Sequence, residues 1–470
     1  MSSRRDLLMM CLFGLLVAFF AAWGIGVRAT YGAQTTADEP QYLLSALSLW
    51  EDGDLDISDQ LRDGRYREFH EVELPTQTQV LEDGRRISPH DPLLPVLLAV
   101  PMGLGGWVGA KASLAILGGA LAALTVWAAQ HCLGVSRRTA YITGSLFALA
   151  PPLFIYSTQV YPEIPAALAV LAGFAAVVGP FQLRGRLVFA IAVIALPWLA
   201  VKYLPLAAVL AVAGLIKAGK GRRSTLVLTF AVAAAVYLVG HLAIYGGLTA
   251  YATGDHFVGG EFTAVGSQVD LWGRSARLIG LLVDRGFGIA AWQPAFLLLP
   301  LVAGWALARR GEGFAVAGWL AGTGWLVATF VAFTMHGWWF PGRQLVVVLP
   351  LAVLLIGAWV DGARSRRTSL LVLLGLPGVI ASWFLVVEGL QGRLTWVVDF
   401  GATSNPLYGA LATVMPDYMA PGGFTWALHG AWVSVALALG WLGWRIGTLR
   451  REETREPESK RDRKQEGVLT

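Results

Sequence analysis

Two adjacent carboxylates, Asp38 and Glu39, stand soon after the first long apolar run of the chain. The residues after Pro40 place apolar side chains at helical spacing, which predicts an amphipathic helix that begins at Asp38, ends at Gly53 and lies on the outer membrane surface. A carboxylate within hydrogen-bond reach of a hydroxyl can take its proton as a general base. Taken alone, the pattern favours a structural role, in which Asp38 caps the helix and Glu39 is a first-turn charge.

Two cations are the next candidates for chemistry. Lys202 stands between two short apolar runs, where a charge is costly unless an anion pairs with it. Arg343 ends the polar and aromatic stretch that begins at His336, and a guanidinium can hold phosphate oxygens in a bidentate fork. Either cation could instead be an anchor whose charged end reaches the lipid headgroups.

The composition predicts that a membrane must hold these residues in place. Apolar residues make up 56% of the 470 residues and charged residues only 14%, against roughly 25% in a soluble domain. The 19 tryptophans suit a protein whose indole rings lie at membrane–water boundaries. The net charge of +5 is not pooled on one basic face, so nothing indicates nucleic-acid binding. No Cys/His cluster has zinc spacing.

The apolar runs predict an all-α integral membrane protein with about twelve transmembrane helices. Arg4 and Arg5 place the N-terminus in the cytoplasm, and a twelve-span order also keeps every basic cluster between spans inside. The predicted spans are 7–27, 110–131, 139–157, 164–180, 187–201, 203–217, 225–245, 291–308, 314–334, 344–360, 369–387 and 426–445.

The apolar stretch 93–108 is expected not to cross, because counting it would move Arg137 and Arg138 outside. It contains Pro95 and Pro101 and is predicted to be a re-entrant or surface-lying helix on the outer side. The domain prediction is one membrane domain over 1–449 with three long outer loops, followed by a disordered charged cytoplasmic tail. The loops are 28–109, which holds amphipathic helices, 246–290 and 388–425, and the tail is 450–470.

Three stretches of the first outer loop resemble a known family. They are Asp38-Glu39-Pro40-Gln41-Tyr42-Leu43, Leu49-Trp50-Glu51-Asp52-Gly53-Asp54-Leu55-Asp56 and Ser88-Pro89-His90-Asp91-Pro92-Leu93-Leu94-Pro95. They are similar to the first-loop motifs of bacterial polytopic glycosyltransferases of the GT-C superfamily, relatives of the protein O-mannosyltransferases and of the aminoarabinose transferases of lipid A. Weaker matches follow in family order at 161–165, 201–203, 284–288 and 341–344.

The resemblance implies a specific reaction. Such enzymes take a monosaccharide from a polyprenyl-phosphate carrier and pass it to a glycan, lipid or protein acceptor on the outer face of the membrane. The family's catalytic aspartate matches Asp38, and Glu39 would raise the pKa of Asp38 by like-charge repulsion or bind the acceptor. Binding of a divalent metal near the acidic first loop is a further possibility, although no ligand spacing requires one.

The same resemblance assigns residues to substrate binding. The leaving phosphate carries negative charge, so Arg343 is expected to hold it first and Lys202 second. Tyr42, His90 and Glu163 belong to the matched motifs and are predicted to line the substrate site. Glu163 also suits a structural role at the start of the next helix, and His90 could lie in a solvated loop.

Two other functions share these features. A transporter or flippase of a lipid-linked sugar would also have many spans, but its polar groups usually lie near the bilayer midplane. A glycan polymerase or ligase would act on the same outer face. Because the acidic residues gather in the outer loops, the sequence favours a transferase in the inner membrane with cytoplasmic termini and a periplasmic active site.

Overall fold

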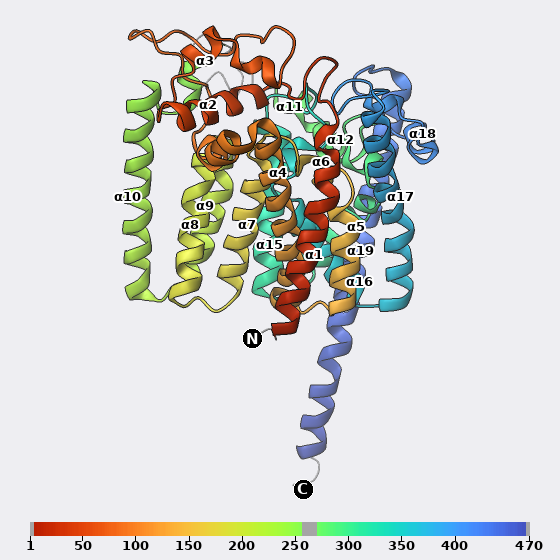
Figure 1. Cartoon of the computed structure of the whole chain (residues 1–470). Helices are drawn as coiled ribbons and strands as arrows, with labels where there is room; N and C mark the ends of the chain where they lie inside the picture. The colour runs from red at the N-terminus through yellow and green to blue at the C-terminus, as the bar shows by residue number, and fades with distance from the viewer. Residues whose placement is uncertain (1–3, 256–269, 467–470) are drawn as a thin grey trace.

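The computed structural model describes residues 4–255 and 270–466, and this part of the chain is almost entirely helical (Figure 1). Within it, extended backbone pairing is limited to four isolated bridges between loop residues. The all-α prediction is therefore confirmed. The centre of the predicted loop 246–290, residues 256–269, lies outside the described residues.

The helices form one bundle. Its larger helices are α1 (Arg4–Ala22), α4 (Leu93–Cys132), α5 (Arg137–Ala148), α7 (Glu163–Val178), α8 (Leu183–Leu199), α9 (Leu204–Lys217), α10 (Lys220–Tyr245), α14 (Leu299–Leu307), α15 (Glu312–Leu326), α16 (Leu349–Asp361), α17 (Arg364–Leu390) and α19 (Gly423–Glu466). The shorter helices are α2 (Glu39–Glu51), α3 (Ser58–Arg62), α6 (Leu153–Tyr156), α11 (Leu271–Ser275), α12 (Arg277–Val283), α13 (Ile289–Trp292) and α18 (Pro406–Ala412).

Length and apolar composition show that this is a multi-pass membrane protein. In the described residues, six helical segments are long and apolar enough to cross a membrane, and three shorter apolar helices accompany them. The six are Arg4–Gly26, Leu93–Cys132, Lys220–Thr253, Glu312–Val331, Ser365–Leu390 and Gly423–Leu449. The predicted total of twelve stays a prediction.

Prolines divide two of the predicted spans. The run 139–157 is not one helix, because α5 ends at Ala148 and the short α6 begins only after Pro152. The run 291–308 is likewise made of α13, a 3-10 turn that begins at Pro294, and α14. A proline lacks the backbone N–H that a helix interior requires, so each break falls where the hydrogen-bond ladder cannot continue.

The stretch 93–108 forms a separate arm at the start of α4. At Gly106 the backbone has φ 57° and ψ −156°, a conformation that glycine adopts readily, and the helix is broken there. Before the break, Gly103 lies against Trp50 of α2, and a Cβ at this glycine would be 2.0 Å from the indole ring. Figure 1 shows the start of α4 beside α2 at one end of the bundle.

The two ends of the bundle differ in what they carry. The N-terminus and the C-terminus lie at the same end, which we call the termini end, and residues 28–92 with α2 and α3 cover the opposite loop end (Figure 1). The basic connections after α7 and α9 lie at the termini end (Figure 1).

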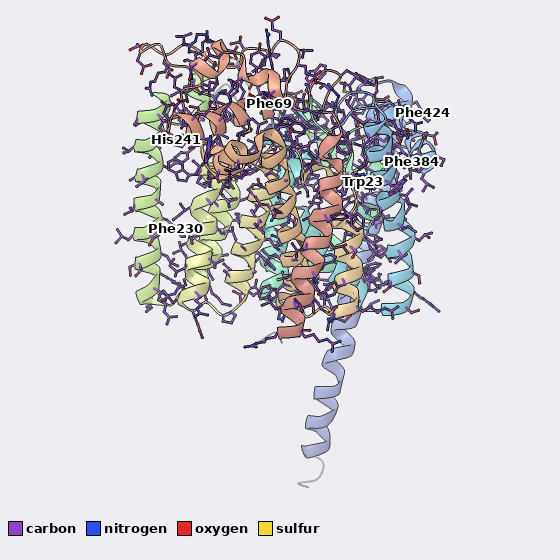
Figure 2. All side chains as sticks on the ribbon, viewed as in Figure 1. Trp23, Phe69, Phe230, His241, Phe384 and Phe424 are labelled. Carbon is purple, nitrogen blue, oxygen red and sulfur yellow. The ribbon has the colours of Figure 1, made fainter. Side chains whose placement is uncertain are left out.

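The predicted outer loops meet at the loop end. The Gln79 backbone N–H donates to the Thr253 carbonyl oxygen over 2.8 Å, which joins the first loop to the segment after α10. The Trp396 backbone N–H donates to the Arg28 carbonyl oxygen over 2.9 Å, which joins the C-terminal loop to the first. Phe69, labelled in Figure 2, is buried inside the first loop.

Helix α2 corrects one expectation. Its bounds agree with the predicted helix, but it is not an amphipathic helix lying on the membrane surface. Every residue from Glu39 to Ser48 is buried, because α4 covers one side of α2 and the loop chain covers the other. The turn that carries Asp38 is therefore fixed by packing.

The C-terminal helix packs against α14 through glycines. A Cβ at Gly443 would lie 1.9 Å from the Leu301 carbonyl oxygen, and one at Gly304 would lie equally close to the Gly440 carbonyl oxygen. Small residues allow two membrane helices to approach backbone to backbone. The segment 450–470, expected to be a disordered tail, is helical as far as Glu466, and its Glu, Lys and Arg residues have high helix propensity.

Candidate active site

Asp38 does not cap α2. Its side chain accepts no hydrogen bond from the first turn of the helix, so the capping role is wrong. One carboxylate oxygen, Oδ2, instead accepts a hydrogen bond from Arg343 Nη2 over 2.7 Å. The residue before it, Ala37, has φ +49°, a left-handed conformation that a non-glycine residue seldom adopts. The Asp38 carboxylate is thus held in a strained turn.

Side chains from two other segments hold this turn in place. Gln77 Nε2 donates to the Ala37 carbonyl oxygen over 3.1 Å, and the Tyr161 hydroxyl donates to the Thr36 carbonyl oxygen over 3.2 Å. Both contacts act on the backbone directly before Asp38. They resist the relaxation that the left-handed residue would otherwise favour.

Arg343 binds two of the predicted site carboxylates, Glu163 and Asp38. Its Nε donates to Glu163 Oε1 over 3.0 Å while its Nη2 holds Asp38. The Lys202 Nζ donates to the same Glu163 oxygen over 2.9 Å. Four segments that are far apart in the sequence therefore bring two carboxylates and two cations into one cluster. We call Asp38, Glu163, Lys202 and Arg343 the charged cluster.

Local structure positions each member of the cluster. Glu163 is the first residue of α7, where the helix dipole favours a negative charge. Lys202 lies in the 3-10 turn Val201–Tyr203, between α8 and α9, which confirms the predicted break between the two apolar runs. Arg343 begins the 3-10 turn Arg343–Leu345, directly after Gly342 in the left-handed conformation at φ +84°.

Two aromatic rings enclose the Arg343 guanidinium. Its Cζ lies 3.8 Å from the centre of the Tyr161 ring and 5.0 Å from the Trp339 ring. Cation–π contacts of this kind stabilise a desolvated charge, and Arg343 is only 6% exposed. Sequence reasoning missed both rings as site residues. Their only signal was their place in the chain, since Tyr161 begins the matched stretch 161–165 and Trp339 lies in the aromatic stretch before Arg343.

His90 faces the other oxygen of Asp38. The distance from His90 Nε2 to Asp38 Oδ1 is 3.6 Å, and the His90 and Tyr42 rings lie with their centres 4.6 Å apart. Tyr42 is buried one helical turn after Asp38. The structure therefore places both predicted residues beside the candidate base.

Arg343 makes Asp38 a weak base. Burial opposes ionisation of the Asp38 carboxyl, but the positive charge of Arg343 outweighs it and holds the pKa well below its usual range. The carboxylate is therefore ionised at neutral pH. It is poorly basic for as long as Arg343 is paired with it.

Glu39 is turned away from this site. Its Oε1 accepts the Val160 backbone N–H over 2.7 Å, and its Oε2 accepts the Thr36 backbone N–H over 2.9 Å. The side chain is fully buried, and burial raises the pKa of the Glu39 carboxyl. Glu39 does not line the cavity beside Asp38 that is described below. The expected contact with the acceptor is therefore replaced by a structural role. Glu39 ties the Asp38 turn to the chain before α7.

A buried lysine of α4 supports the same turn. Lys111 is 1% exposed, and its Nζ donates to the Gln34 carbonyl oxygen over 2.6 Å. Lys111 could not be selected from the sequence, because it stands at the edge of a predicted span. Its partner is a backbone oxygen, and a backbone partner cannot be recognised from the types of the residues in the sequence.

A cavity of about 900 Å³ opens beside the charged cluster at the loop end. Asp38, Lys202 and Arg343 line it, and apolar and aromatic side chains form much of the remaining wall. The other lining residues include Tyr42, His70, Val72, Leu74, Pro75, His90, Tyr251, Phe333, Trp338 and Trp339. The combination suits a ligand that carries an anionic group, hydroxyls and an apolar part.

The described residues contain no group of three or more His, Cys, Asp or Glu side chains arranged to hold a metal ion. Acidic residues of the first loop are engaged elsewhere. Glu51 pairs with Arg65 over 2.8 Å, and Asp56 accepts hydrogen bonds from Ser58 and from the Arg86 backbone.

Comparison with known proteins identifies the fold. No protein-family model and no curated protein sequence matches the chain. Among solved structures, ArnT from Cupriavidus metallidurans bound to undecaprenyl phosphate matches 98% of this chain and 80% of its own, with 15% identity and a TM-score of 0.53. The apo state of the same protein matches 96% and 78%, with 16% identity and a TM-score of 0.53. The chain thus has the fold of ArnT over nearly its whole length, which confirms the predicted resemblance at the level of the fold.

Proposed function

We propose that the protein is a membrane glycosyltransferase that moves a monosaccharide from a polyprenyl-phosphate carrier to a hydroxyl of a glycan, lipid or protein. One observation carries this proposal. Asp38, Arg343 and Lys202 line a single cavity, in a fold shared with a protein whose crystals hold undecaprenyl phosphate. A base and two cations beside one cavity match what the transfer of a sugar from a phosphate requires.

In this proposal each group has its own step. Arg343 and Lys202 attract the phosphate, and the guanidinium stabilises the charge that develops there as the sugar leaves. Asp38 takes the proton of the acceptor hydroxyl as its oxygen attacks the anomeric carbon. One base and one departing phosphate are sufficient for inversion at that carbon.

We also propose that the loop end faces the periplasm. The N-terminal arginines and the basic connections after α7 and α9 lie at the termini end, where the positive-inside rule places the cytoplasm. With this orientation, twelve spans in the inner membrane account for the order of the loops. The cavity then opens where an outer acceptor can reach it.

The position of the charges favours a transferase over a flippase or transporter. Transporters usually bind substrate near the bilayer midplane on broken helices. Here the charged cluster lies at the loop end, in the Asp38 turn, two short 3-10 turns and the first residue of α7. A polymerase or ligase would use the same face, and analysis of the transferred glycan separates it from a monosaccharide transferase.

Binding of undecaprenyl phosphate tests the proposed phosphate site. Lys202→Met should weaken binding about tenfold, and Arg343→Lys should weaken it as well, because an ammonium cannot reproduce the bidentate fork. Arg343→Ala is a poorer test, since it removes the ion-pair partner of Asp38 and one of the two cations paired with the buried Glu163, and can cost about 3–5 kcal/mol of stability.

The dissociation constant can be measured by native mass spectrometry of the purified protein. Arg65→Ala is the matched control, because Arg65 pairs with Glu51 in the first loop and does not line the cavity. Equal affinity in wild type, Lys202→Met and Arg343→Lys would show that these cations do not bind the phosphate.

A further inference from the structure

The two oxygens of Asp38 have different surroundings. Oδ2 is bound to Arg343 at 2.7 Å, whereas Oδ1 lies 3.6 Å from His90 Nε2, which is longer than a hydrogen bond. The Asp38 side chain is 28% exposed, and both Asp38 and His90 line the cavity. An acceptor hydroxyl can therefore approach Asp38 at Oδ1, directly beside the His90 ring.

The His90 ring is fixed on its remaining sides. Ser88 Oγ and His90 Nδ1 are 2.8 Å apart, and Ser88 is buried. Tyr42 covers one face of the ring, and the Tyr245 hydroxyl donates to the His90 carbonyl oxygen over 2.9 Å. When Nδ1 carries the proton and donates to Ser88, the lone pair of Nε2 points toward Asp38. The imidazole is then poised to receive a proton.

Asp38 is badly suited to keep the proton that it takes. Arg343 holds the pKa of Asp38 well below the usual range, and even when a bound phosphate takes Arg343 away, a protonated carboxyl is a stronger acid than an imidazolium. An ordinary imidazole, with a pKa of about 6.5, binds a proton more tightly than an ordinary aspartate, with about 3.9. The proton therefore moves downhill from the carboxyl to a neighbouring neutral histidine.

We propose that His90 finally binds the proton that leaves the hydroxyl of the sugar acceptor, and that this proton reaches His90 through Asp38. This inference rests on the proposed glycosyltransferase function. The acceptor oxygen forms a bond to the anomeric carbon as the bond from that carbon to the phosphate oxygen breaks, and the electron pair leaves with the phosphate. The hydroxyl proton passes to Asp38 Oδ1 and then to His90 Nε2. The products are the glycoside, the polyprenyl phosphate and an imidazolium beside the Asp38 carboxylate.

The charged residue that follows His90 in the chain already has a partner. Asp91, the next residue, accepts a hydrogen bond from His241 Nε2 of α10 over 2.8 Å. Figure 2 places His241 on the part of α10 that is nearest the loop end. The titratable or charged side chains that face His90 or line the cavity with it are Tyr31, Asp38, Tyr42, His70, Glu73, Asp91, Lys202, Tyr245, Tyr251 and Arg343. Asp38 is the one ion-pair partner of His90 among the described residues.

The pH dependence of transfer tests the inference. In wild type the initial rate should fall as the medium becomes acidic, because a protonated His90 cannot accept a second proton. In His90→Gln the rate at pH 8 should be 10- to 100-fold lower, and this fall between pH 7.5 and 5.5 should disappear. His131→Gln, which alters an exposed histidine on α4 far along the chain from the cavity residues, should keep the wild-type profile.

The measurement uses purified full-length protein, undecaprenyl-phosphate-linked mannose, glucose or aminoarabinose as donor, and a bacterial envelope extract as acceptor. Imidazole should restore part of the lost rate to His90→Ala and leave the rate of His131→Ala unchanged, a rescue that a purely structural role of His90 would not produce. If wild type transfers none of these sugars, the proposed function fails. If wild type transfers sugar but His90→Gln keeps the same pH profile, or imidazole restores nothing, the inference about His90 fails.

Discussion

At the scale of single residues, the charged cluster is electrically balanced. Asp38 and Glu163 carry two negative charges, and Lys202 and Arg343 carry two positive charges. A donor phosphate adds a negative charge to this balance and must compete with Asp38 for the Arg343 guanidinium. The bound phosphate would release Asp38 from the pairing that weakens it as a base.

Asp38→Asn should therefore tighten the binding of undecaprenyl phosphate. The amide removes the charge that repels the phosphate and frees a guanidinium for it, and a hydrogen bond to a charged group contributes about 1.5–3 kcal/mol. The dissociation constant should fall by about tenfold, as measured by native mass spectrometry. Asp83→Asn, which removes an exposed carboxylate paired with Arg85, should leave it unchanged. Weaker binding by Asp38→Asn would contradict the competition.

The sequence predicted most of the members of the site but few of their contacts. Six selected residues surround one cavity or its charged cluster: Asp38, Tyr42, His90, Glu163, Lys202 and Arg343. The capping role failed because residue preference cannot show that an arginine 305 positions away binds the carboxylate more favourably. Glu39 could not be placed from its type, since its partners are backbone N–H groups.

At the scale of the elements, apolar runs predicted where helices lie better than where they are interrupted. The break at Gly106 and the divided runs near Pro152 and Pro294 depend on local backbone conformation. The burial of α2 depends on what covers it, which its own sequence does not contain. The approach of α19 to α14 likewise needs both partners, although Gly440 and Gly443 mark one side of it.

Gly443→Leu should destabilise the contact between α14 and α19. The new side chain would meet the Leu301 carbonyl oxygen, and overpacking costs about 1–3 kcal/mol. Thermal unfolding of the purified protein in detergent should shift to lower temperature. Gly430→Leu is the matched control on the same helix, because a Cβ there meets nothing within 4 Å. Equal thermal shifts for the two variants would refute the close packing.

At the scale of the whole molecule, both termini lie at one end and the cavity opens at the other. Because both termini lie at the same end, the chain crosses an even number of times, as the basic clusters predict. The sequence could predict which segments share an end, because the positive-inside rule acts on each loop. It could not predict how residues 28–92 fold over the cavity, since hydrogen bonds to the distant segments 246–255 and 393–400 hold them there.

Labelling of single cysteines in intact cells tests the orientation. Glu82→Cys lies exposed in the first loop, and Ser224→Cys lies exposed near the start of α10, at the termini end. A membrane-impermeant maleimide should label the first and not the second, in a background without Cys11 and Cys132. Permeabilised cells provide the control, since both positions should then react. If only Ser224→Cys is labelled in intact cells, the proposed orientation is wrong and the termini end faces outward.

The central claim is that Asp38 takes a proton during sugar transfer. The most direct test compares wild type, Asp38→Asn and Asp83→Asn for transfer from undecaprenyl-phosphate-linked sugars to the envelope extract. Because general-base catalysis typically contributes about 10²–10⁴-fold, Asp38→Asn should lose at least about 100-fold in rate while it still binds undecaprenyl phosphate. Asp83→Asn should keep the wild-type rate. Transfer by Asp38→Asn at close to the wild-type rate would contradict the account.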